Sequence, residues 1–526
     1  MSWKTKTARW ACGKHGWLAL VGGISLLLWG LSGLTHIAMV LFGPQQAQFM
    51  PPRASLDLQG SAPASEMLEK AGISRAIAVK TVAYEGRSLL QVTTDPAGQR
   101  RYFDPAAGEE LAGQDARQAE YLARYYLKEE RPIASIALQT DFDADYGWVN
   151  RLLPVWKIRF AGDDRLTAYV HTETSSLAAV NNGTKQWLQA IFRTLHSWDW
   201  VPASMTWLKV VVAGTMVGSL AALALTGIAM LVTVRRKKRL PGAKGWHRIA
   251  GYILALPLIM FSLSGIYHLV QGAIAPPAGQ MRMAAPIDLS AGRFPIGAQW
   301  SELTRGLKVD SLSLVEGEGG RPLYRLGLAR EDAMPKGEHD HGARANSAAP
   351  ADHAGHGDHM GHAMPKTAME IRTARFDGVQ PTGPALYIDA ETGAVAPQGD
   401  RELARMLASR YADVGEHKIV DMRLVTRFGP DYDFRNKRLP VWRVDYAAPV
   451  NATLFVDTAT GALADRVERW QMPERYVFSF IHKWNFLFPL GKIGMNAVVG
   501  GFTIALMLFM GAIGLQLYLR LRRSRR

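Results

Sequence analysis

Histidines inside long apolar runs are the residues of this chain best suited to chemistry. His36 and His268 each close a Ser-Gly-x-x-His sequence, and a second histidine stands 21 residues upstream of each, at His15 and His247. An ionisable side chain within an apolar span is costly and is a functional candidate by default. Neutral imidazole nitrogen is also a normal axial ligand of haem iron. The four histidines are therefore candidate haem ligands.

The spacing places these histidines near both membrane surfaces. On an ideal helix, 21 residues rise about 31 Å and return to within roughly 60° of the starting direction. Two matching helices can then clamp a planar iron porphyrin between paired imidazoles, once near each surface. The alternative for His15 and His247 is hydrogen bonding to lipid headgroups or loop carbonyls. The small Ser-Gly pair before His36 and His268 leaves room for either a porphyrin or a close helix neighbour.

A third pair, His196 and His482, precedes the second and fourth apolar runs. Tryptophan and phenylalanine surround both, as in an interfacial aromatic belt. The candidate haem ligands are thus His15, His247, His36, His268, His196 and His482. The outer pairing stays open among His36–His268, His196–His482 and two crossed pairs that hold two haems.

Four apolar runs must position these residues. Each is long enough to span a bilayer, at about 20 residues of 1.5 Å rise. They cover roughly residues 17–42, 210–234, 249–272 and 495–519. Basic residues gather before the first run, between the second and third, and after the fourth, which puts these segments in the cytoplasm. The net charge of +15 is therefore a topological signal and predicts no nucleic-acid partner.

The chain repeats itself at two constant offsets. His15 to His247 and His36 to His268 are both 232 residues apart, whereas the Leu-Pro-Val-Trp sequences at 153–156 and 439–442 are 286 apart, as are His196 and His482. The difference, 54 residues, is a net insertion in the second half. The repeated unit is helix, exported domain, helix. The only cysteine, Cys12, leaves haem ligation to residues other than thiolates.

The predicted fold class is a multi-pass α-helical membrane protein with four transmembrane helices, an internal duplication and two exported α+β domains. Helices are expected at 116–130 and 402–411, and strands at 155–160, 168–171, 441–446 and 453–456. The expected order is a cytoplasmic N-terminus (1–16), helix 1 (17–42), an exported domain (43–195), a pre-span segment with helix 2 (196–234), a basic loop (235–246), helix 3 (247–272), a second exported domain (273–481), a pre-span segment with helix 4 (482–519) and a basic tail (520–526).

Other histidines receive different predictions. His171 is expected at the surface end of a strand, and His417 is expected to be structural or solvated. The insertion 334–366 is rich in Ala, Gly and Asp and is a weak candidate metal site, since imidazole and thioether ligands suit copper or zinc. Its candidate ligands are His339, His341, His353, His356, His359, His362 and Met360.

The chain resembles the PepSY-associated transmembrane-helix family. The paired histidines, the Leu-Pro-Val-Trp strands and the Tyr-Ile-Asp-Ala-Glu-Thr-Gly turn at 387–393 carry the resemblance. The family implies PepSY-like exported domains and an inner bacterial membrane. It includes haem-containing reductases of ferric siderophores, so the resemblance implies b-type haem. One histidine pair near each membrane surface predicts two haem groups.

The predicted function is electron transfer across the inner membrane to a ferric siderophore or other metal chelate in the periplasm. No Rossmann glycine fingerprint follows a predicted strand, so a separate donor, a quinol or a cytoplasmic reductase, is expected. One alternative is a cupric reductase or copper-handling protein, suggested by the His/Met insertion. Another is a membrane-anchored binding or regulatory protein without redox chemistry.

Overall fold

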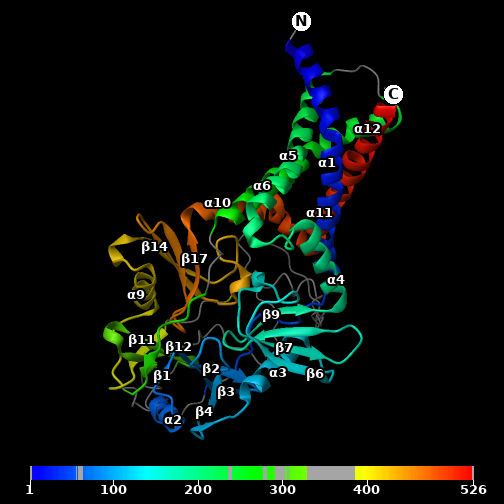
Figure 1. Cartoon of the computed structure of the whole chain (residues 1–526). Coiled ribbons are helices and arrows are strands. Elements are labelled where there is room, and N and C mark those ends of the chain that lie inside the picture. The colour runs from blue at the N-terminus through cyan, green and yellow to red at the C-terminus, as the bar shows by residue number, and fades with distance from the viewer. Residues whose placement is uncertain are drawn as a thin grey trace, which may run out of the picture.

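The computed structural model describes residues 3–54, 56, 63–234, 240–275, 281–290, 303–304, 307–328, 379 and 385–523. Figure 1 shows a bundle of long helices at one end and a sheet-rich part at the other, here called the extramembrane unit. Both chain termini lie at the far end of the bundle (Figure 1). The histidine-rich insertion 334–366 and the basic run 235–239 lie outside the described residues.

Four helices are long and apolar enough to cross a membrane. They are α1 (Trp3–Phe42), α5 (Thr206–Thr233) with the 3-10 turn η3 (Ala203–Met205) before it, α6 (Gly242–Ile274), and a composite of α11 (Gly491–Ala505), η11 (Leu506–Ala512) and α12 (Ile513–Arg523). Helix α5 packs against both α1 and α6, and the composite helix closes the ring against the same two. Helix α1 begins at Trp3, well before the predicted start of the span, and no proline interrupts residues 3–17.

A seven-stranded antiparallel sheet joins the two halves of the chain. Its order is β13 (Ala385–Asp389), β12 (Pro322–Leu328), β11 (Val309–Glu316), β2 (Ala78–Tyr84), β3 (Arg87–Thr93), β4 (Arg101–Asp104) and β5 (Glu109–Glu110). Strands β11 and β2 pair through Ser313 with Lys80 and Leu314 with Val79. The first half therefore supplies one side of this sheet and the second half the other. Helix α2 (Ala64–Lys70) packs on its core, and β1 (Arg75–Ala76) pairs with β10 (Ile287–Asp288) beside it.

Each half also forms a four-stranded antiparallel sheet covered by one helix. The first is β6 (Ile133–Gln139), β7 (Val155–Phe160), β8 (Thr167–His171) and β9 (Ser176–Asn181), with α3 (Gln114–Leu127). The second is β14 (Ile419–Val425), β15 (Val441–Tyr446), β16 (Ala452–Val456) and β17 (Leu463–Glu468), with α9 (Asp400–Ala412). The predicted helices and strands of both halves are confirmed to within three residues. An apolar core between sheet and helix forms in each.

The two four-stranded sheets share local irregularities. A register shift between Ile133 and Ser135 in β6 has its counterpart between Ile419 and Asp421 in β14. Both shifts stand 286 residues apart, the offset that the sequence repeats. Bulges bend a strand at a defined point, so the two sheets curve at equivalent positions.

Buried charges link the halves within the extramembrane unit. The Glu173 carboxylate, fully buried, pairs with the Arg438 guanidinium of the other half and lies 3.3 Å from the Lys80 ammonium. Arg151 of the first half donates a hydrogen bond to the Asn436 side chain of the second half at 2.6 Å. A buried charge is tolerated only when it is paired, so these contacts fix how the two halves meet.

The prediction for His171 is wrong. Its side chain is fully buried at the end of β8, beside the turn that carries Glu173, and its Nδ1 lies 2.8 Å from the Thr174 hydroxyl. Burial lowers the pKa of His171 well below its ordinary value. The sequence could not show this, because residues that surround His171 electrostatically, Arg438 and Lys80 among them, lie far from it in the chain.

Candidate functional site

The histidine pair at the far end of the bundle, His15 and His247, forms what we call the distal pair. The Nδ1 atom of His15 lies 3.1 Å from the Leu223 carbonyl of α5 and equally far from the Thr226 hydroxyl. The Nδ1 atom of His247 lies 2.7 Å from the Phe509 carbonyl of the composite helix. A carbonyl only accepts hydrogen bonds, so each Nδ1 carries the proton and each Nε2 lone pair is left available.

The separation of the distal rings suits a metal between them. Their centroids are 6.1 Å apart and their planes meet at 65°. Two metal–nitrogen bonds of about 2 Å, with ~1 Å from each nitrogen to its ring centre, put two axial imidazoles ~6 Å apart. The observed separation matches that of a bis-imidazole site.

Glycines make room for both distal rings. A Cβ atom at Gly227 of α5 would lie 3.5 Å from His15 Cε1, and one at Gly514 of α12 would lie 3.3 Å from His247 Cε1. A long side chain at either position would displace the ring that it faces. Each neighbouring helix therefore holds its imidazole by hydrogen bonding at Nδ1 and by one glycine contact.

The other four candidates form the proximal cluster, near the extramembrane unit: His36, His196, His268 and His482. His196 ends the π-helical turn η2 (Phe192–His196), which continues α4 (Gly183–Ile191). Its Nδ1 lies 3.1 Å from the Ser32 hydroxyl, which itself donates to the Leu28 carbonyl. Ser32 therefore accepts from His196 Nδ1, and the Nε2 lone pair is again left available.

The second half repeats this contact. His482 ends the π-helical turn η9 (Val477–His482), which follows α10 (Met472–Tyr476), and its Nδ1 lies 3.0 Å from the Ser264 hydroxyl. A Cβ at Gly33 or at Gly265 would lie 3.7 or 3.8 Å from Cε1 of the facing histidine. In each half, the Ser-Gly pair thus positions the histidine that precedes the next span. The serine hydroxyl binds its ring, and the glycine leaves space for it.

Burial keeps His196 and His482 neutral. It lowers the pKa of His196 to about 4. Burial also lowers the pKa of His482 to about 3, with further contributions from the imidazoles of His196, His268 and His36. Neutral imidazole is the form that ligates iron, so both rings stand ready as ligands near pH 7.

The two remaining histidines are less enclosed. His36 faces the Phe192 ring at 5.6 Å between centroids. His268 keeps about half of its side chain exposed and bonds the Glu474 carboxylate through Nδ1. The structure thus brings all six sequence-predicted histidines to the bundle, as one close pair and one cluster of four.

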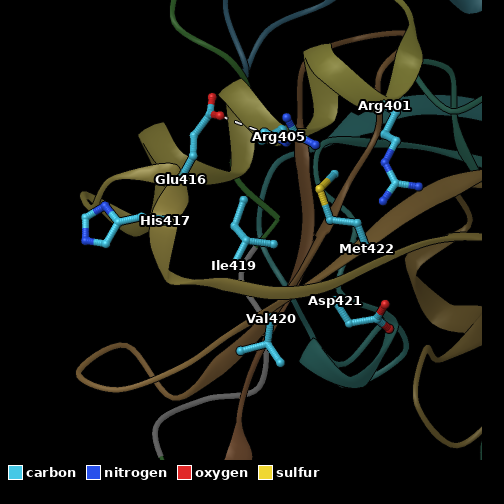
Figure 2. Close-up of a pocket in the computed structure, with 8 residues that line it drawn as sticks. All are labelled: Arg401, Arg405, Glu416, His417, Ile419, Val420, Asp421 and Met422. Carbon is cyan, nitrogen blue, oxygen red and sulfur yellow. Dashed lines mark ion pairs between the residues drawn. The ribbon is translucent and has the colours of Figure 1, made fainter.

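A pocket of about 420 Å³ lies elsewhere, at the edge of the second four-stranded sheet. Figure 2 shows Arg401 and Arg405 reaching over it from α9, with Asp421 on β14 below. His417, on the turn η6 (Glu416–Lys418), is exposed at its rim, as predicted for a solvated residue. None of the candidate haem ligands lines this pocket.

The predicted metal ligands of the insertion, His339, His341, His353, His356, His359, His362 and Met360, lie outside the described residues. Within the part of the chain that is described, no three His, Cys, Asp or Glu side chains are grouped as a metal ion would need. Two axial histidines form a smaller group than that, so the finding does not bear on haem.

Sequence reasoning missed the residues that orient the histidines. Gly227 and Gly514 contact the distal rings, and Phe192 and Phe478 stack on the proximal ones. Phe192 and Phe478 are 286 residues apart, so comparing the two halves position by position would have found them.

Four apolar helices and attached α+β sheets define a polytopic membrane protein with a large extramembrane part. The family model of the PepSY-associated TM region matches residues 13–368, more than half of the chain, so the chain belongs to this family. No curated protein matches the sequence.

Proposed function

We propose that this protein is a b-type haem protein of the bacterial inner membrane that passes electrons to a ferric chelate, such as a ferric siderophore, in the periplasm. The distal pair carries the proposal. His15 and His247 come from different helices, each is hydrogen-bonded through Nδ1, and their ring centroids stand 6.1 Å apart. A packing or headgroup role needs no such matched geometry.

Haem held by the distal pair and by the proximal cluster would supply one-electron transfer between the two membrane faces. The chain's own residues orient the ligands. Carbonyls of Leu223 and Phe509 fix the distal tautomers, and Ser32 and Ser264 fix the proximal ones. Hydrogen bonds of this kind set ring orientation and ligand basicity.

For the proximal haem we propose His196 and His482 as the axial pair. They are partly buried, their pKa values are lowered, and equivalent serines hold them. His36 and His268 then flank the pair from the side of the extramembrane unit. Replacing His196 or His482 with Ala should remove one haem and spare the other.

We further propose that the chain is an internal duplication with two PepSY-like domains, which the matched sheet irregularities and the 286-residue offset support. The basic segments at the far end of the bundle favour a cytoplasmic location for both termini. The extramembrane unit would then face the periplasm, where a ferric chelate meets it. Its electrons would come from a separate quinol or cytoplasmic donor.

A visible spectrum of the detergent-purified full-length protein, before and after dithionite, tests the proposal. We expect a Soret band and a sharpened α band on reduction. His15→Ala and His247→Ala should lower the haem content, whereas His417→Ala, an exposed histidine, should not. A protein without a Soret band, after expression with ample haem, would overturn the proposal and favour a non-redox binding role.

A copper substrate is the second candidate. It rests on the six histidines and nearby methionines of the insertion, because imidazole with thioether favours copper. Separate assays of ferric and cupric reduction by a variant that lacks residues 334–366 decide between a ferric and a copper substrate. Loss of cupric reduction alone would favour copper.

A further inference from the structure

Each half of the bundle contains a stack of three rings at its proximal end. In the first half, the Phe192 ring lies between two imidazoles. It stacks on His196 at 4.6 Å and 14°, and it meets His36 at 5.6 Å and 51°. The π-helical turn brings residues 192 and 196 into register, since Ser197 N–H donates to the Phe192 carbonyl five residues back.

The second half repeats these ring contacts, with His268 closer to its phenylalanine than His36 is and His482 farther from it than His196 is. The Phe478 ring lies 4.0 Å from His268 and 5.2 Å from His482, with interplanar angles of 16° and 14°. Here His268 Nδ1 donates to the Glu474 carboxylate, which is largely buried. The Lys483 ammonium sits 4.4 Å from the centre of the Phe478 ring. A carboxylate, Glu474, and an ammonium, Lys483, therefore both contact these rings.

The first half has no charge at either equivalent position. The 286-residue offset that relates His482 to His196 also relates Glu474 to Leu188 and Lys483 to Ser197. The rings are repeated but the charges are not. The first half brings a phenylalanine ring against two histidines without a carboxylate, although its His36 ring is tilted and lies farther from the phenylalanine than His268 does.

A carboxylate that accepts the Nδ1 proton makes an imidazole a stronger electron donor. A nearby negative charge also favours the more positively charged oxidised iron, and second-shell hydrogen bonding and charge are recognised controls of haem potential. Glu474 should lower the reduction potential whichever of the two histidines, His268 or His482, is the haem ligand. It acts through the hydrogen bond if His268 is a ligand, and through space across Phe478 if His482 is.

We propose that Glu474 is a positioning residue that lowers the reduction potential of the haem held by the proximal cluster. The proposal rests on the proposed function, which supplies the haem. A lower potential makes the proximal haem a stronger reductant. That suits a ferric ion that hard oxygen ligands hold in its oxidised state.

The test is a redox titration of the visible spectrum of the full-length protein in detergent, with haem content measured alongside. We expect Glu474→Gln to shift one component of the titration to more positive potential and leave the other in place. Glu474→Asp should keep the wild-type potential. Leu188→Glu, which places a carboxylate at the equivalent first-half position, should shift a component to more negative potential, whereas Leu188→Gln should not.

The outcomes separate the two proposals. Haem in the wild type with unchanged potentials in Glu474→Gln and Leu188→Glu overturns the role of Glu474 alone. A wild type without haem overturns the proposed function as well. If Glu474→Gln loses haem, Leu188→Glu decides: a negative shift supports the inference, and no shift overturns it.

Discussion

At the scale of single residues, the bundle orients each well-placed imidazole through Nδ1. The acceptors are carbonyls for the distal pair and serine hydroxyls for His196 and His482. In every case Nε2 is left for another partner. One tautomer, repeated at four positions, suits ligation better than a structural role, where either nitrogen would serve.

The serines should therefore matter for haem and little for folding. Ser32→Ala and Ser264→Ala remove the acceptor of the His196 or His482 Nδ1 proton. We expect haem affinity at the proximal site to fall about tenfold or more, measured as haem content after dilution or competition with apomyoglobin.

Ser25→Ala is the matched control. Ser25 is equally buried in α1, and its hydroxyl donates to the Val21 carbonyl of the same helix. Equal haem loss in Ser25→Ala and Ser32→Ala would mean that serine supports the helix rather than the ligand.

At the scale of elements, helix surfaces shape the distal site. Helix α5 presents Gly227 to the His15 ring, 3.5 Å from where its Cβ would be. Gly214, on the same helix, would place its Cβ in open space. Gly227→Leu should displace the ring and reduce distal haem, as seen in the spectrum and in redox titration. Gly214→Leu should leave haem unchanged, and equal loss in both would point to a general defect of α5.

The junction between the halves depends on a buried ion pair. Burial alone would raise the pKa of Glu173, but the charges of Arg438 and Lys80 more than offset this and hold it well below its usual value. Glu173→Gln removes one of the two carboxylates that pair with the buried Arg438, Asp457 being the other, and should cost up to about 3–5 kcal/mol of unfolding free energy in denaturant titration. Glu110→Gln, at a partly exposed pair with Arg101, should cost about 1 kcal/mol or less.

The same pair predicts a pH dependence. The pKa of Glu173 is lower in the folded than in the unfolded protein. Its ionised carboxylate therefore contributes fully to stability above the unfolded pKa of about 4.3. This contribution is lost as the pH falls toward the folded pKa. Wild-type stability should therefore fall more steeply below pH ~4 than that of Glu173→Gln. Parallel pH profiles of the two proteins would contradict this.

At the scale of the whole molecule, the sequence predicted what is periodic or repeated. The four spans, the paired histidines and the two helix-covered sheets all follow from apolar length and constant offsets. The pairing of β2 with β11 did not follow, because two residue pairs far apart in the chain carry it. No sequence pattern singles out Glu173, since its partner Arg438 is 265 residues away. Long-range contacts of this kind leave no local pattern.

The last prediction concerns which way the molecule crosses the membrane. Cys12, the only cysteine, is exposed near the far end of the bundle, and Asp163 is exposed on the extramembrane unit. If basic segments stay in the cytoplasm, a membrane-impermeant maleimide should label Cys12 only after cells are permeabilised. In a Cys12→Ser background, Asp163→Cys should be labelled in spheroplasts without permeabilisation. The reverse pattern would place the extramembrane unit in the cytoplasm, where no periplasmic chelate could reach the proximal cluster.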